Sequence, residues 1–105
     1  MQEPTFLILT ALAGESRHGY GVMQEVEALS GGRVRLRPGT LYAALDRLVA
    51  EGFVAVDREE VVASRLRRYY RLTAEGMAAL TEESARLAAN VAVARRRLRR
   101  AGVTA

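Results

Sequence analysis

The chain has 105 residues, no cysteine and a formal net charge of +4, and every one of its sixteen strongly basic side chains is an arginine. A chain of about 100 residues usually folds as one domain, and the lack of cysteine excludes disulfides and thiolate metal sites. No apolar run approaches the length of a membrane span, and no basic-then-apolar leader opens the chain. We therefore expect a cytoplasmic protein without a membrane partner.

The charge is distributed unevenly along the chain. Residues 1–32 carry one arginine and four acids, residues 33–72 carry nine arginines and five acids, and residues 73–105 carry six arginines and three acids. A GC-rich coding bias would also favour arginine, so the total charge is weaker evidence about function than the distribution of the charge along the chain. An acidic first third and a basic remainder predict one basic face, which suits a polyanionic partner.

Two helices are predicted first. Pro4 suits a first helical position, and the segment from Phe6 to Leu12 is apolar nearly all round, which predicts burial on more than one side. Gly14 ends this helix. A second helix is predicted from about His18 to Leu29. Its inner face should carry Tyr20, Met23 and Val26, with Val22 and Leu29 nearer the edge of that face.

A very short strand and a third helix follow. Arg33–Leu36 alternates polar and apolar residues, as a strand does. The next stretch, RPGTLYAALDRLVAEG, predicts a helix with Pro38 at its first position and Gly52 at its end. Arg37 occupies the cap position but cannot accept a bond from the helix N–H groups, so about 1 kcal/mol of capping is missing. The inner face of this helix should carry Leu41, Leu45, Leu48 and Val49.

A strand hairpin and a long helix complete the chain. Phe53–Arg58 and Leu66–Leu72 are rich in β-forming residues, and the EEVVASR stretch between them lacks Gly, Pro and Asn. We therefore expect a hairpin with a longer, looser tip. Thr73 should cap the final helix. Its apolar positions keep a heptad spacing over about three heptads: Met77, Leu80, Ser84, Leu87, Val91, Ala94 and Leu98.

This order of elements predicts the fold class. Three helices, a two-stranded hairpin and a long last helix give a mostly α (α+β) protein with a winged helix-turn-helix. We expect residues 1–72 to form a DNA-binding domain and residues 73–105 to form a C-terminal dimerisation helix. The heptad seam is too long to bury on one small domain, which predicts a homodimer. The residues expected to face the partner are Leu80, Leu87, Val91 and Leu98.

The outward face of the third helix is small and nearly free of acids, as a helix entering the DNA major groove requires. Thr40 could hydrogen-bond a base or a phosphate, Ala43 could contact a thymine methyl, and Arg47 could bind guanine with both guanidinium nitrogens or bind a phosphate. Backbone N–H groups at Gly39 and Thr40 could bind phosphate. The arginines of the hairpin could lie along the sugar–phosphate backbone or enter the minor groove. The whole candidate DNA-binding set is Arg37, Gly39, Thr40, Tyr42, Ala43, Arg47, Arg65, Arg67 and Arg68.

Each of these features also has a plainer interpretation. An alanine-rich helix face is simply a good helix former, and strand arginines often only solvate an exposed edge. Glu59 and Glu60 would repel phosphate, so contacts are expected nearer the strands than the tip. The arginines of residues 95–100 suit a solvated helix end, a further phosphate contact or an acidic protein. The rival function is a winged-helix module whose basic face binds an acidic protein partner.

Nothing in the sequence points to catalysis, a metal or a cofactor. His18 is the only histidine, and no cysteine or carboxylate cluster lies near it in the sequence. We expect it to fix the start of the second helix by hydrogen bonding. No Ser/His/Asp order, Gly-rich phosphate loop or paired acid predicts an enzyme.

The stretches HGYGVMQEVEALSGGRVRLRPGTLYAALDRLVAEGFV and RYYRLTAEG resemble the PadR family of bacterial transcriptional regulators. The resemblance extends from about Phe6 to Leu80, and the short C-terminal part is similar to the compact branch of that family. It implies a homodimer bound to operator DNA, with the subunits paired by the C-terminal helix. Many members are repressors released by small apolar or aromatic ligands. The chain departs from the family at Arg37, usually a small capping residue, and at the wing tip, usually Gly-rich or basic.

A two-fold dimer that reads successive major grooves requires an inverted-repeat operator, with half-site centres about 10–10.5 base pairs apart or a multiple of that. The sequence therefore predicts a dimeric transcriptional regulator, associated with the nucleoid, that represses from such an operator.

Overall fold

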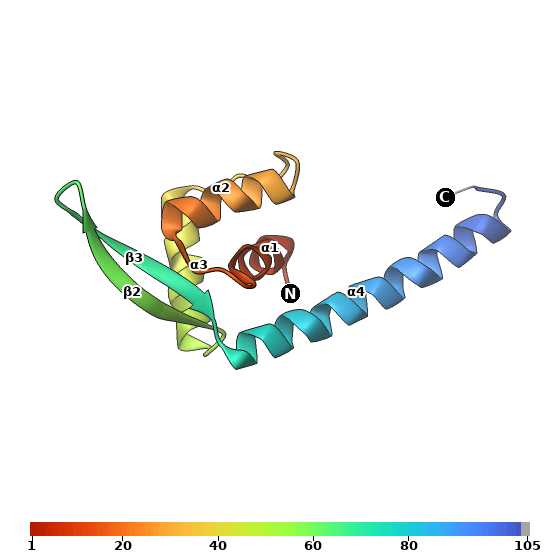
Figure 1. The fold of residues 1–105 in the computed structure, drawn as a ribbon. Helices are drawn as coiled ribbons and strands as arrows, with labels where there is room; N and C mark the ends of the chain where they lie inside the picture. Colours follow the sequence, from red (N-terminus) through yellow and green to blue (C-terminus); the bar gives the residue numbers. More distant parts are fainter. Residues whose placement is uncertain (104–105) are drawn as a thin grey trace.

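A computed structural model describes residues 1–103, which form four helices and a three-stranded antiparallel sheet (Figure 1). Residues 104 and 105, which belong to the predicted C-terminal segment 73–105, lie outside the described residues. The architecture is the predicted winged helix-turn-helix followed by a long helix. In chain order its elements are α1 (Glu3–Leu12), β1 (Arg17–His18), α2 (Gly19–Leu29), α3 (Pro38–Ala50), β2 (Val54–Val62), β3 (Arg65–Leu72) and α4 (Ala74–Arg100).

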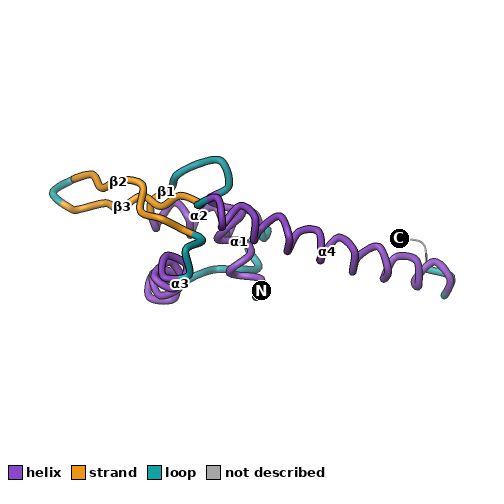
Figure 2. Tube along the Cα trace, turned by 90° about the horizontal axis from the view of Figure 1, so that it is seen from below, coloured by secondary structure: helices purple, strands orange, loops and turns teal. Residues whose placement is uncertain are grey.

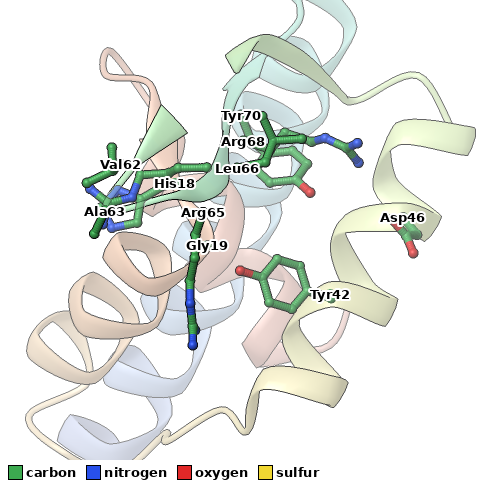
Figure 3. A pocket seen from close by; sticks show the side chains of 11 residues that line it. His18, Gly19, Tyr42, Asp46, Val62, Ala63, Arg65, Leu66, Arg68 and Tyr70 are labelled. Atoms are coloured by element: carbon green, nitrogen blue, oxygen red, sulfur yellow. The ribbon is translucent and has the colours of Figure 1, made fainter. Parts of the chain in front are cut away.

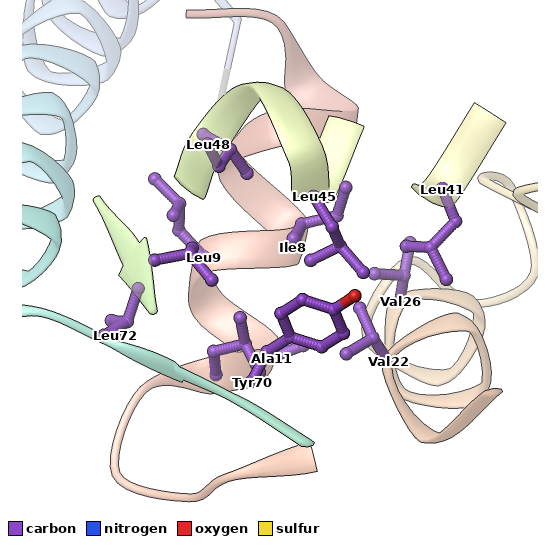
Figure 4. Close-up of a cluster of buried hydrophobic side chains, with 12 residues drawn as sticks. Ile8, Leu9, Ala11, Val22, Val26, Leu41, Leu45, Leu48, Tyr70 and Leu72 are labelled. Atoms are coloured by element: carbon purple, nitrogen blue, oxygen red, sulfur yellow. The ribbon is translucent and has the colours of Figure 1, made fainter. Parts of the chain in front are cut away.

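The core gathers around α1, between α2, α3 and the inner face of the sheet (Figure 4). The predicted burial of α1 on more than one side is confirmed, because Ile8 and Leu9 are wholly buried and face different neighbours. The ring of Tyr70 reaches from β3 into the middle of the cluster. Each large apolar side chain buried in this way contributes about 1.5–3 kcal/mol to folding. The other core members are Ala11, Leu12, Val22, Val26, Leu41, Leu45, Leu48, Val54 and Leu72.

Three residues assigned to inner faces prove to be exposed. Tyr20 and Leu29 of α2 are 61% and 46% exposed, and Val49 of α3 is 38% exposed. The buried stripe of α2 is centred on Val22 and Val26, and a step of about 100° per residue places Tyr20 on the opposite side. Val49 lies on the flank of its helix for the same reason. Leu29 lies on the same side of α2 as Val22 but is the last residue of that helix.

The predicted strand at Arg33–Leu36 is wrong, because these residues have no strand partner. Val34 and Leu36 pack against the core, and the Val34 N–H donates to Ser30 Oγ at 2.9 Å. Arg33 and Arg35 are exposed and pair with Glu3 and Glu27, so partly buried and exposed residues alternate here without a strand. The short strand lies instead at Arg17–His18, where β1 pairs antiparallel with Tyr69 and Tyr70 of β3.

Strands β2 and β3 form the wing, and the prediction of a loose tip for it is also wrong. The strands stay paired up to Val62 and Arg65, so only Ala63 and Ser64 form the turn. Their φ angles are 51° and 65°, in the left-handed region that costs ordinary residues about 1–2 kcal/mol each. The ladder of strand pairs on both sides holds the turn closed. One bulge interrupts the ladder, between Val56 and Arg58.

Helix α4 begins as predicted, with Thr73 Oγ1 accepting a hydrogen bond from the Gly76 N–H at 3.0 Å. A Cβ at Gly76 would overlap the carbonyl oxygen of Phe53, so this position requires glycine. The first turns of α4 pack against α1, but every residue from 84 to 100 is exposed. Figures 1 and 2 show α4 projecting from the body on the side opposite the wing. No helix of the described residues is long and apolar enough to cross a membrane.

Candidate nucleic-acid interface

The start of α3 is uncovered. Gly39, Thr40 and Ala43 are exposed, and a Cβ added at Gly39 would meet no atom within 4 Å. Arg37 precedes the helix in an extended conformation, with φ −82° and ψ 152°, and makes no capping hydrogen bond. The first N–H groups of α3 therefore have no side-chain acceptor from the cap position. Such a helix start is a site where an anion is stabilised.

A groove of about 580 Å³ separates α3 from the wing (Figure 3). Tyr42 and Asp46 of α3 form one wall, and the inner face of the wing forms the other. The start of α2 supplies His18 and Gly19. The remaining lining residues are Val62, Ala63, Arg65, Leu66, Arg67, Arg68 and Tyr70.

Tyr42 is held at the edge of this groove by Gly19. A Cβ at position 19 would overlap the hydroxyl end of the tyrosine ring, so the absence of a side chain creates the space that Tyr42 occupies. The ring is 44% exposed, and its hydroxyl points toward Gly19 in Figure 3. This contact joins the flank of α3 to the start of α2 and fixes the width of the groove at that point.

The acidic first third of the chain neutralises part of the basic segment that precedes α3. Arg33 pairs with Glu3 at 2.8 Å, and Arg35 pairs with Glu27 at 3.1 Å. Arg37, two residues further on, is in no ion pair with a carboxylate of residues 1–103. The free positive charge of this segment is therefore concentrated at the start of α3.

In the wing, too, some arginines are in ion pairs and others are not. Ion pairs join Arg58 with Asp57 and Glu60, Arg68 with Glu59, and Arg71 with Asp57. Within the described part of the chain, Arg65 and Arg67 have no such partner. An ion pair on a surface contributes about 0–1 kcal/mol, so Arg68 can exchange Glu59 for another anion at little cost. Arg65 and Arg67 can bind an anion without first breaking an ion pair.

Arg47 lies apart from the groove. Its guanidinium donates to Glu51 and to Thr5 Oγ1, each at 3.0 Å, on the side of α3 that faces α1. It borders a second cavity of about 350 Å³, together with Met1, Gln2, Thr5, Leu48, Glu51 and Phe53. The structure thus brings Tyr42, Arg65, Arg67 and Arg68 around one groove and leaves Arg47 on the opposite flank.

His18 has a place that the sequence did not reveal. It makes no capping hydrogen bond at the start of α2, contrary to the expectation. Its ring instead packs edge-on against Tyr69, with the two ring centroids 5.4 Å apart. The guanidinium of Arg58 stacks on the same tyrosine, 3.9 Å from the centroid of its ring. Burial lowers the pKa of His18, and the positive charge of Arg67 lowers it further. Only the pairing of β1 with β3 brings these residues together, and a two-residue strand gives no readable pattern.

The four residues expected at a dimer interface occupy two different environments. Leu80 is partly buried against the core of its own chain. Leu87, Val91 and Leu98 lie further along α4 and are 37%, 46% and 43% exposed. They fall on the same face of the helix as Leu80, so the apolar seam continues beyond the body with no partner among residues 1–103.

Known proteins share both the sequence and the architecture of this chain. Residues 8–82 match the transcriptional regulator PadR-like family. Over 76 residues the chain is 46% identical to transcriptional regulator Rv3488 of Mycobacterium tuberculosis, a match that covers 72% of this chain and 67% of that protein. The family match extends over the helices and the strands that form the groove.

Two solved structures show the same fold. A PadR family transcription regulator from Clostridium difficile R20291 superposes with a TM-score of 0.76 at 22% identity, covering 92% of this chain and 99% of that chain. Bacillus subtilis PadR, solved in complex with operator DNA, superposes with a TM-score of 0.68 at 22% identity, covering 77% and 46%. The matched family consists of transcriptional regulators and not of enzymes, which agrees with the absence of catalytic motifs. The chain belongs to the PadR-like family of transcriptional regulators.

Proposed function

We propose that this chain is a homodimeric regulator that binds an operator in duplex DNA. The observation that carries the proposal is the groove between α3 and the wing, which is bordered by Arg65 and Arg67, neither of them in an ion pair with residues 1–103. In the complex α3 enters the major groove, which is about 12 Å wide and accepts one helix. The wing then lies along the neighbouring sugar–phosphate backbone, and the groove receives that backbone between the two elements.

The exposed residues of α3 divide into two roles. Arg37 and the N–H groups at Gly39 bind phosphate at the helix start, where the helix dipole adds to the attraction. Thr40 and Ala43 face base edges, and Tyr42 reaches the backbone from the flank. Arg47 reads a base after it exchanges Thr5 and Glu51 for DNA. The wing arginines, Arg65, Arg67 and Arg68, supply affinity without sequence preference.

The dimer is formed by α4. Residues 1–72 act as the DNA-binding domain and residues 73–105 as the dimerisation helix. The support for this division is the exposed seam of Leu87, Val91 and Leu98 on a helix whose residues 84–100 are not covered by any part of residues 1–103. A two-fold axis through this pairing presents two α3 helices to successive major grooves and requires an inverted-repeat operator.

The regulator acts as a repressor on the chromosome in the cytoplasm. Bacillus subtilis PadR was solved in complex with operator DNA, which supports the same kind of target for this chain. Release from the operator follows when a small apolar or aromatic molecule binds between the two α4 helices. Such a ligand changes the distance between the two reading helices and need not touch DNA.

Selection of bound fragments from the source genome, followed by a salt titration, tests this function. The logarithm of the affinity should fall linearly with the logarithm of salt concentration, with a slope of about −0.9 for each phosphate neutralised. Selected fragments should bind more tightly than a mixed-sequence duplex at every salt concentration. If neither duplex binds with a steep slope, the basic face serves an acidic protein partner instead, and the proposed function is wrong.

A further inference from the structure

One carboxylate lies on the exposed side of α3 that faces the wing. Asp46 is exposed and is the only acid among the described residues that line the groove. Because side chains four residues apart share one side of a helix, Asp46 lies one turn beyond Tyr42 on the same wall (Figure 3). Asp46 is in no ion pair or hydrogen bond with another side chain of residues 1–103. Its charge is therefore available to a molecule that enters the groove.

The place of Asp46 on α3 mirrors that of Arg47. A step of about 100° per residue places the exposed Ala43 and Ala50 opposite the core, which includes Leu45. The same step places Asp46 on the shoulder of the helix beside the wing and Arg47 on the shoulder beside α1. Only methyl groups stand on the strip between the two shoulders, so a duplex can approach both of them closely.

The two shoulder residues differ in their contacts within the protein. The guanidinium of Arg47 donates to Glu51 and to Thr5, each at 3.0 Å. The carboxylate of Asp46 has no such side-chain partner in the described part of the chain. In the protein without DNA, therefore, the ionic group of α3 that can contact a base without an exchange of partners is the acid.

A purely structural role explains Asp46 poorly. Aspartate is among the weaker helix formers, and alanine or glutamate would suit an exposed position of this helix better. In a groove bordered by Arg65 and Arg67, a carboxylate also weakens the attraction for any polyanion. A residue that lowers affinity in this way can still raise specificity, because specificity is a difference between two affinities.

We propose that Asp46 determines specificity, because its carboxylate accepts a hydrogen bond from the N4 amino group of one cytosine in each half-site and repels DNA that lacks this donor. The proposal rests on the proposed DNA-binding function and names a base that α3 selects. Among the major-groove edges, cytosine presents a donor, whereas guanine and thymine present acceptors. Adenine presents a donor beside an acceptor, and a carboxylate has no hydrogen to give that acceptor.

The same charge acts against every other sequence. On DNA without the matching cytosine, the carboxylate of Asp46 meets base acceptors and phosphates and gains no hydrogen bond in return. Its repulsion then lowers the affinity for non-specific DNA, which is present in large excess in a genome. Asp46 therefore widens the ratio of specific to non-specific affinity from both sides, by attraction in one case and by repulsion in the other.

The test uses Asp46→Asn, because asparagine keeps the shape of the side chain, removes its charge and binds adenine with two hydrogen bonds. Affinity for a mixed-sequence duplex should rise severalfold, since the repulsion is gone. Affinity for the genome-selected operator should fall about tenfold, equivalent to about 1.4 kcal/mol. In competition with single-base operator variants, the preferred base at one position of each half-site should change from cytosine to adenine.

Two further variants separate base reading from charge alone. Glu82→Gln removes the same charge from an exposed position of α4, which projects on the side opposite the wing. It should leave both affinities and the base preference unchanged. Asp46→Ala removes the charge and every hydrogen bond of the side chain. It should raise the affinity for mixed-sequence DNA and prefer neither cytosine nor adenine at the position concerned.

Three results would overturn the inference. If Asp46→Asn raises the affinity for operator and mixed-sequence DNA equally and keeps the base preference, the acid only weakens the attraction of the nearby arginines. If Glu82→Gln has the same effect as Asp46→Asn, the cause is the net charge of the chain. If Asp46→Asn changes neither affinity, the residue is a solvated surface acid. In all three cases the wild type still binds its operator, whereas a wild type without salt-dependent DNA binding would show that the proposed function had failed first.

Discussion

Arg47 of α3 donates a hydrogen bond to Oγ1 of Thr5 in α1, with 3.0 Å between the two atoms. The same guanidinium is 3.0 Å from a carboxylate oxygen of Glu51, one turn further along α3. The predicted base-reading arginine is thus tied to the first helix of the domain in the protein without DNA. Because both pairs are exposed, they contribute little to stability and can be exchanged for a base or a phosphate.

Removing the competing partners of Arg47 should strengthen DNA binding. Thr5→Val combined with Glu51→Ala removes both acceptors of the guanidinium, so affinity for a genome-selected operator should rise modestly. Arg47→Ala should cost about 1–3 kcal/mol on that operator and relax preference at one base pair. Competition binding with single-base operator variants measures both effects. Equal losses on operator and mixed-sequence DNA would reassign Arg47 to a phosphate, and no loss on either would make it a brace between α1 and α3.

Gly39→Ala should change stability and DNA binding in opposite directions. A methyl group at this position meets no atom of the protein, and alanine favours the helix over glycine by about 0.5–1 kcal/mol. Thermal unfolding should therefore shift upward. If DNA backbone approaches the start of α3 closely, the same methyl group will obstruct it and lower affinity about tenfold, or by about 1.4 kcal/mol. An unchanged affinity in the stabilised variant would place the DNA elsewhere.

The fold could be predicted where local rules decide the structure. The spacing of Leu41, Leu45 and Leu48 and the cap at Thr73 gave α3 and the start of α4 correctly. The turn at Ala63 and Ser64 could not be predicted, because the strand ladder overrides the preference of these residues. The strand at Arg17–His18 is too short to show a pattern.

The candidate site was predictable in its composition but not in its arrangement. The sequence indicated that Tyr42 and the wing arginines belong to one basic face, and the structure places them around one groove. It could not indicate all the contacts that hold these arginines, because Glu3, the ion-pair partner of Arg33, lies 30 residues away, and Thr5, a hydrogen-bond partner of Arg47, lies 42 residues away. Contacts between residues so far apart in the sequence depend on the tertiary structure alone.

The pKa of His18 should rise when Arg67 is removed. Burial lowers this pKa most and the charge of Arg67 adds to the effect, so Arg67→Ala should return the value part of the way toward 6.5. As His18 is the only histidine, its ring signals in an NMR titration are unambiguous. Arg65→Ala serves as the control and should leave the value nearly unchanged. An identical titration curve for the wild type and Arg67→Ala would contradict the arrangement of β1 and β3.

The lowered pKa of His18 also determines how the stability of the protein changes with pH. Between the folded pKa of His18 and 6.5, the unfolded chain binds more protons than the folded chain. The contribution of His18 to stability is therefore complete above pH 6.5 and is lost as the pH falls through the folded pKa. Arg67→Ala should narrow this window, which thermal unfolding at a series of pH values can measure.

Charge placed in the seam of α4 should break the dimer. Leu87→Asp or Val91→Asp introduces a carboxylate that cannot be buried without a partner, which costs several kcal/mol at an apolar interface. Sedimentation should show a dimer for the wild type and a monomer for either variant. Val93→Asp is a matched control, because Val93 is as exposed as Val91, at 44%, but lies outside the heptad seam. A monomeric wild type at micromolar concentration would refute the proposed assembly.

The spacing of the operator tests the central claim most directly, because it depends on α3 as the reading element and on α4 as a rigid dimer contact. Operators from the genomic selection are altered by inserting base pairs between the half-sites, and affinity is measured for each. Insertion of about five base pairs, half a helical turn, should place one half-site on the far side of the duplex and remove most of the affinity. Insertion of a full turn should restore the angular match but not the distance. An affinity that is indifferent to the half-turn insertion would show that the two reading helices are not rigidly coupled, and the account of a dimer reading an inverted repeat would be wrong.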